Sequence, residues 1–127
     1  MKTKKVLFIA LIIALTSFTQ RTFAQDWKYW FASEKVQFYY KFVPANGSTY
    51  PHYKLRVINR SEEYKSIYFY PVFKVGQTIT GTSAKRNFFL KPGDGYDETF
   101  YINNQLQIQS GNKIPDLNLK EYSVKKY

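Results

Sequence analysis

The chain has 127 residues, no cysteine, a single histidine and a formal net charge of +10. The missing cysteines exclude disulfide bonds, thiolate metal sites, a cysteine nucleophile and lipid attachment through a cysteine, while one histidine excludes a histidine pair for a metal. A chain of this length is expected to fold as one domain.

The first 24 residues have the layout of a cleavable secretory leader. Lysines at positions 2, 4 and 5 precede an apolar run over residues 6–15, and the small residues Thr22 and Ala24 stand where a signal peptidase reads the chain. This run of ten residues is about half the ~20 needed to cross a membrane, and it lacks the polar face of an amphipathic helix. We therefore expect cleavage between Ala24 and Gln25, no transmembrane anchor, and export to the periplasm or the medium.

Removal of the leader changes the charge balance. Four of the 19 basic residues lie in the leader, which leaves 15 basic against 9 acidic residues in the mature part, a net charge of +6. The basic residues are scattered along the chain. This moderate excess favours contact with anionic glycans or lipid headgroups and makes nucleic acid an unexpected partner.

Residues 25–127 are expected to form a single domain built almost entirely of β-strands. Apolar and polar residues alternate, β-branched and aromatic residues are frequent, and no window has the i, i+3, i+4 spacing of an amphipathic helix. Aromatic residues occupy 22 of these 103 positions. Because an aromatic side chain can bury roughly 150–250 Å², a chain this short can fill a core without disulfides.

The first predicted strands are joined by short turns. A strand over residues 27–31 precedes one over residues 36–42, in which every second residue is apolar and the alternate residues are polar or tyrosine. Asn46-Gly47 is a strong signal for a tight turn, so the strand over residues 53–57 should return beside the second one. The polar segment 59–63 predicts a second hairpin.

Shorter strands follow in the second half of the domain. Residues 67–75 are apolar on both faces, and Pro71, which cannot donate to a β-ladder, predicts an edge or a bulge in this strand. Further strands are predicted around Ile79 and over residues 87–90, 96–102 and 119–126. Seven to nine short strands, with turns about every ten residues, predict a small antiparallel β-sandwich.

Two segments resemble bacterial exported immunoglobulin-like or fibronectin-type sandwich domains. Residues 57–61 form an alternating strand that ends in Asn-x-Ser, and Leu-x-Pro-Gly at residues 90–93 precedes another alternating strand. In that family the Pro-Gly marks the turn before a core strand. The resemblance covers about residues 34–103 and implies an immunoglobulin-like sandwich, but it carries over no functional residue because this fold hosts many unrelated activities.

No residue pattern in the chain points to catalysis. His52 stands at the start of a predicted strand, as a surface or turn histidine does, and no serine lies in a Gly-x-Ser-x-Gly motif. Asp94, Asp97 and Glu98 could act as a carboxylate pair in a hydrolase or offer oxygens to calcium, but they fall in a predicted turn, where carboxylates usually face water. We expect no catalytic residue, no metal and no cofactor.

The candidate binding residues are outward-facing tyrosines with basic neighbours. The strand alternation places Tyr39, Tyr68 and Tyr70 on outer faces, and Lys54 and Arg56 would border them. Such a surface suits sugar rings or a protein partner. The same tyrosines would also stabilise a sheet through cross-strand pairs.

The sequence therefore favours an exported, non-catalytic module that binds an envelope or extracellular partner, as a monomer or weak dimer. A glycan-binding module that uses the surface tyrosines is the more specific alternative. A small hydrolase with carboxylate chemistry is the alternative from another class.

Overall fold

The computed structural model describes residues 27–127; the predicted leader and its cleavage position lie outside the described residues. This part of the chain contains eight strands and one short helix, which confirms the prediction of a nearly all-β domain. The elements are β1 (Lys28–Ser33), β2 (Val36–Val43), β3 (His52–Asn59), β4 (Lys65–Val75), β5 (Thr78–Thr82), β6 (Arg86–Leu90), β7 (Gly95–Tyr101), α2 (Asn104–Gln109) and β8 (Asp116–Lys126).

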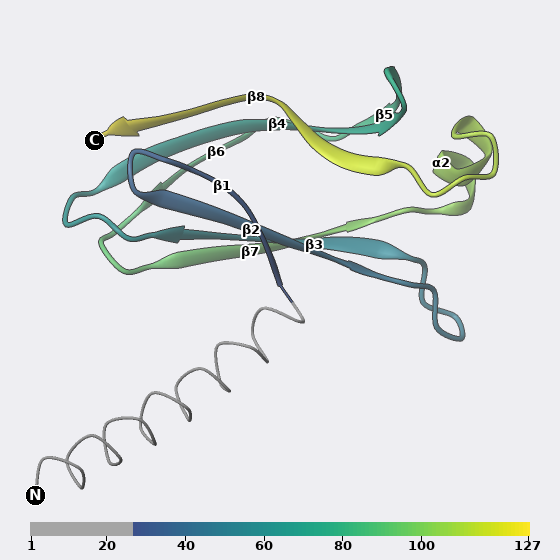
Figure 1. Cartoon of the computed structure of the whole chain (residues 1–127), viewed down its shortest axis with the longest axis horizontal. Helices are drawn as coiled ribbons and strands as arrows, with labels where there is room; N and C mark the ends of the chain where they lie inside the picture. The colour runs from purple at the N-terminus through teal and green to yellow at the C-terminus, as the bar shows by residue number, and fades with distance from the viewer. Residues whose placement is uncertain (1–26) are drawn as a thin grey trace, which may run out of the picture.

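The strands form two antiparallel sheets that lie on each other as two layers (Figure 1). The first sheet has the order β1-β2-β3-β7. In the second sheet, β4 is central: it pairs with β8 along one side, and with β5 and β6 one after the other along the opposite side. This arrangement is the β-sandwich that the strand spacing predicts.

Aromatic rings join the two layers. Phe38 of the first sheet meets Phe69 of the second edge to face, with 6.4 Å between ring centroids. At one side of the sandwich Phe31 lies 4.6 Å from the ring of Tyr122. At the other side Tyr96 stacks at 4.2 Å on a ring of β6, that of Phe88. Burial of such rings is the main favourable contribution in a core that has no disulfide.

The hairpin predicted at Asn46-Gly47 is present, and Gly47 has the positive φ of +58° that this turn requires. Pro71 lies at a bulge: the pairing of β4 with β8 shifts between Phe69 and Pro71, as the missing N–H predicts. A short helix, by contrast, was not expected. It has six residues and one buried side chain, Leu106, so it leaves no periodic stripe in the sequence.

The prediction of a second hairpin at residues 59–63 is wrong. This segment carries the chain from β3 in the first sheet to β4 in the second. Its conformation is set by Asn59, which is fully buried; its Nδ2 donates to the carbonyls of Glu63 (2.8 Å) and Leu90 (3.0 Å). Its Oδ1 accepts from the backbone N–H of Ser61 at 3.0 Å and from the hydroxyl of the same residue. One amide thus connects β3, the crossover and the end of β6.

Replacement of Asn59 by alanine should destabilise the domain by about 2–4 kcal/mol, because it leaves buried backbone groups without partners. Urea unfolding followed by far-UV circular dichroism measures this loss. Asn118→Ala, at an exposed position of β8, is the matched control and should change the free energy of unfolding by less than about 0.5 kcal/mol. Equal stability of the two variants would contradict the role of Asn59.

Candidate functional site

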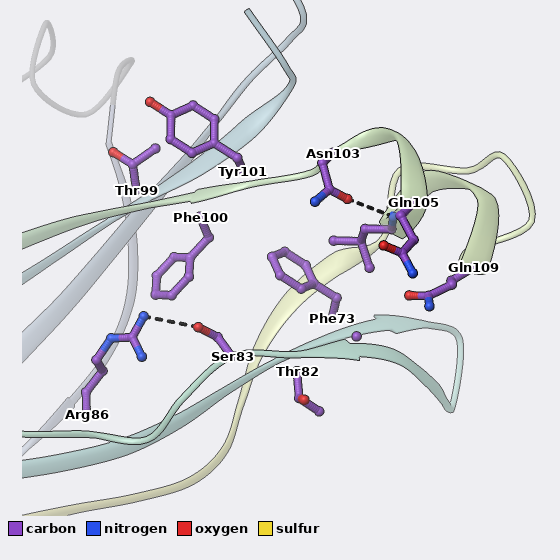
Figure 2. Close-up of a pocket in the computed structure, with 12 residues that line it drawn as sticks. Phe73, Thr82, Ser83, Arg86, Thr99, Phe100, Tyr101, Asn103, Gln105 and Gln109 are labelled. Atoms are coloured by element: carbon purple, nitrogen blue, oxygen red, sulfur yellow. Dashed lines mark hydrogen bonds between the residues drawn. The ribbon is translucent and has the colours of Figure 1, made fainter.

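A groove of about 410 Å³ opens at the end of the sandwich where β5 lies near α2 (Figure 2). It lies between β5 and the segment that leads from β7 into α2. Twelve residues line it: Phe73, Gly81, Thr82, Ser83, Arg86, Thr99, Phe100, Tyr101, Asn103, Gln105, Leu106 and Gln109. We refer to it as the end groove.

The floor of the end groove is apolar. It includes the buried side chains of Phe73, Phe100 and Leu106, one from each of β4, β7 and α2. Gly81 allows the helix to approach β5, because a Cβ atom at this position would lie 2.6 Å from Cδ1 of Leu106. The floor therefore depends on a strand position without a side chain.

The rim of the end groove is polar and uncharged. A hydroxyl group comes from Ser83, and carboxamide groups come from Asn103, Gln105 and Gln109, whereas the side chains of Thr82 and Thr99 point away from the groove (Figure 2). Figure 2 shows Ser83 and the three carboxamide side chains around the opening. Asn103 caps the helix, since its Oδ1 accepts from the backbone N–H of Leu106 at 2.9 Å. Gln105 and Gln109 are four residues apart, so they lie on one face of α2, and both are exposed.

Arg86 is the one charged residue in the lining, and a carboxylate neutralises it. Its Nε donates to Oε1 of Glu98 at 2.7 Å, and its Nη2 lies 2.5 Å from Oε2. The two side chains are only 24 % and 16 % exposed. The guanidinium also donates to Ser83 Oγ at 3.1 Å and to the carbonyl of Ala84. Hydrogen bonding to Glu98 raises the pKa of Arg86. The end groove therefore presents hydrogen-bonding groups without net charge.

The ion pair of Arg86 extends to a tyrosine in the core. The hydroxyl of Tyr96 donates to Oε1 of Glu98. Burial, the hydrogen bond to Glu98 and the negative charge of Glu98, in this order, raise the pKa of Tyr96 to about 12. A second tyrosine with a raised pKa, Tyr53 of β3, contacts the segment at the start of β8. Burial and the charge of Asp116 raise its pKa to about 12, and its hydroxyl donates to the carbonyl of Pro115 at 2.9 Å.

The five binding residues predicted from the sequence lie on two surfaces rather than one. Tyr39 and Arg56 are directly opposite each other on β2 and β3, and Lys54 is on the same face of β3. Tyr68 and Tyr70 belong to β4, in the other sheet, and alternate there with core residues. The two groups therefore lie on opposite outer faces of the sandwich, and none of the five lines the end groove.

Two of the three carboxylates that the sequence places in a turn lie elsewhere in the structure. Asp97 and Glu98 lie within β7 rather than in a turn, and they face opposite sides of the sheet. Both oxygens of Asp97 accept from Arg56 at 2.9 Å, and these bonds lower its pKa, opposite to the shift that a general acid needs. Asp94 is exposed in the turn before β7, where its carbonyl accepts from the N–H of Asn59.

His52 is buried at the start of β3, with its Nδ1 3.0 Å from the carbonyl oxygen of Tyr50 and its ring 5.2 Å from that of Tyr101.

Between residues 27 and 127, no cluster of three or more histidine and carboxylate side chains is placed to hold a metal ion. The same part of the chain has no helix long and apolar enough to cross a bilayer.

Sequence reasoning missed the end groove. Its lining comes from β4, β5, β6, β7 and α2, which only the folded chain brings together. One signal in the sequence could have pointed to it: five of the seven residues from 103 to 109 carry a carboxamide. Comparison with known proteins gives no further guide, because no family model, curated protein or solved structure matches this chain.

Tyr96 and Tyr53 should ionise near pH 12, which tyrosinate absorbance at 295 nm can follow. Because the pKa of each is higher in the folded than in the unfolded state, the stability they contribute is complete below about pH 10 and is lost as the pH rises towards 12. Tyr96→Phe should remove one late-ionising group and flatten the fall of stability above pH 10. An unchanged titration curve in this variant would contradict the raised pKa of Tyr96.

Proposed function

We propose that the protein is a non-catalytic binding module whose end groove takes a neutral, polyhydroxylated ligand, that is, an oligosaccharide. The observation that carries this proposal is the combination of an amide-rich polar rim with an apolar, partly aromatic floor. A sugar presents hydroxyl groups at its edge and C–H groups on its ring faces, so it matches both parts. The groove volume of about 410 Å³ lies within the usual range of small-molecule sites, roughly 300–1,000 Å³.

We propose a neutral ligand because the guanidinium of Arg86, the charged group in the groove lining, is already paired with Glu98. Ser83 and Ala84 accept two further hydrogen bonds from this guanidinium. An anionic ligand would have to compete with Glu98 for this group, whereas a hydroxyl group can bind at the rim without breaking the pair. Carboxamides suit hydroxyl ligands because each one both donates and accepts.

The proposal leaves no catalytic role for the two carboxylates of β7. Asp97 is engaged by Arg56 on the outer face of the first sheet, and Glu98 is engaged by Arg86 and Tyr96. Neither is placed as one of two facing carboxylates around the end groove, the arrangement that glycoside hydrolysis uses. Retention of the sugar, rather than its cleavage, is the function that the geometry supports best.

We further propose that the sandwich is of the immunoglobulin type. The chain crosses from the first sheet to the second between β3 and β4, returns between β6 and β7, and crosses again between β7 and β8. On its return, β7 pairs with β3 and β8 pairs with β4. In immunoglobulin domains strands B and E are neighbours in one sheet, and C and F are neighbours in the other. The correspondence of β3, β4, β7 and β8 with B, C, E and F supports the resemblance noted in the sequence.

A binding test of the end groove uses Gln105→Ala/Gln109→Ala, which removes two rim carboxamides and keeps the helix cap at Asn103. Titration calorimetry against neutral hexasaccharides, such as those of cellulose, chitin and starch, should show saturable binding by the wild-type protein. Loss of two hydrogen bonds, each contributing about 0.5–1.5 kcal/mol, should weaken this binding at least about fivefold.

The matched control is Asn104→Ala, which removes a carboxamide from the same helix outside the groove lining. Its affinity should stay within about twofold of the wild type. Absence of binding to every neutral oligosaccharide, or an equal loss in the control and the double variant, would refute the proposed site.

Export is part of the same proposal, and the leader-like residues 1–24 support it. The intact mass of the protein recovered from the cells that produce it should correspond to a chain that begins at Gln25. A mass that includes residues 1–24 would contradict processing at Ala24.

A further inference from the structure

The outer face of the first sheet contains a pair of like charges at directly opposite positions. Lys41 of β2 is in register with Lys54 of β3. Side chains at such positions are close neighbours, and like charges there destabilise a sheet. In the next row of the same face Tyr39 is opposite Arg56, so three cationic residues gather on two adjacent strands.

Acidic residues offset only part of this charge. Asp97 gives both of its oxygens to Arg56, and in the described range of 27–127 neither Lys41 nor Lys54 belongs to an ion pair. A fourth cation, Arg60, donates from Nε to the neutral carboxamide of Gln37 at 3.1 Å. The face therefore carries an excess of positive charge that an anionic ligand would compensate.

Aromatic rings border these cations. The ring of Trp27 lies 4.9 Å from Nζ of Lys41 and 4.3 Å from Cζ of Arg56. On the neighbouring strand Tyr29 meets Tyr39 edge to face at 5.7 Å, and Tyr29 is 58 % exposed. We call the surface formed by Trp27, Tyr29, Tyr39, Lys41, Lys54, Arg56 and Arg60 the basic face.

We propose that the basic face binds a linear acidic polysaccharide, with carboxylate groups of the polymer at Lys41 and Lys54 and sugar rings against the exposed tyrosine. The positive excess supplies the charge complementarity. This surface is separate from the end groove, shares no residue with it and does not depend on its function.

The aromatic residues of the basic face favour a polysaccharide over a lipid bilayer. A bilayer is bound by apolar side chains that enter the boundary of the acyl chains. Here the exposed ring of Tyr29 ends in a hydroxyl group, whereas Trp27 is only 8 % exposed and is held against two cations. A hydroxyl-bearing ring beside lysines suits a hydrated, anionic polymer.

The test compares Lys41→Gln/Lys54→Gln with Lys85→Gln/Lys120→Gln, using the protein as its cells process it and polygalacturonate as the probe. The second variant removes the same charge from the opposite side of the sandwich, where Lys85 and Lys120 flank the ring of Tyr70. Wild-type protein should bind polygalacturonate with an affinity that falls as salt rises. The Lys41 and Lys54 variant should bind at least tenfold more weakly, and the control should stay within about twofold.

A stability measurement separates loss of binding from loss of folding. Relief of the like-charge repulsion should offset the lost contact of Lys41 with Trp27, so the urea midpoint of the Lys41 and Lys54 variant should not fall below that of the wild type. A lower midpoint, equal losses of binding in the two variants, or binding to anionic phosphatidylglycerol vesicles but not to polygalacturonate would each overturn the proposal. Because this variant leaves Gln105 and Gln109 intact, its result is independent of the test of the end groove.

Discussion

The ion pair between Arg86 and Glu98 is the interaction on which the end groove depends. It joins β6 of one sheet to β7 of the other, in a place where both side chains are largely shielded from water. Through Ser83 and Ala84 it also fixes the segment between β5 and β6 that borders the end groove. A charge pair in such a place is costly to break, because a lone partner stays buried without compensation. It therefore sets both the geometry of the groove wall and the neutrality of the groove.

The two proposed binding surfaces differ in chemistry because they differ in their place on the sandwich. The end groove lies where the sheets separate, so core residues such as Phe100 form its floor and the polar ends of strands form its rim. The basic face lies on a single sheet, where alternation sends one row of side chains outward and puts Lys41 beside Lys54. The first surface suits uncharged sugars and the second suits acidic ones, so both are compatible with a polysaccharide ligand.

The sequence predicts the strands well and their assembly less well. Alternation over β2 and β3 identifies their core-facing residues because one side of each strand is dry. It does not show which sheet a strand joins, since this depends on the long-range hydrogen bonds of Asn59 to Glu63 and Leu90. For the same reason Tyr39 and Tyr70 were predicted to share a surface although they lie on opposite sheets. The end groove was beyond prediction because five separate elements line it, and α2 is too short to give a periodic signal.

The most direct test of the central claim is an NMR search for intermolecular nuclear Overhauser effects between the isotope-labelled protein and an unlabelled neutral oligosaccharide that binds it. We expect contacts between sugar C–H protons and the side chains of Phe100 and Leu106, together with shifts of the carboxamide signals of Gln105 and Gln109. A bound oligosaccharide whose contacts lie elsewhere, with these four residues unaffected, would show that the end groove is not the site.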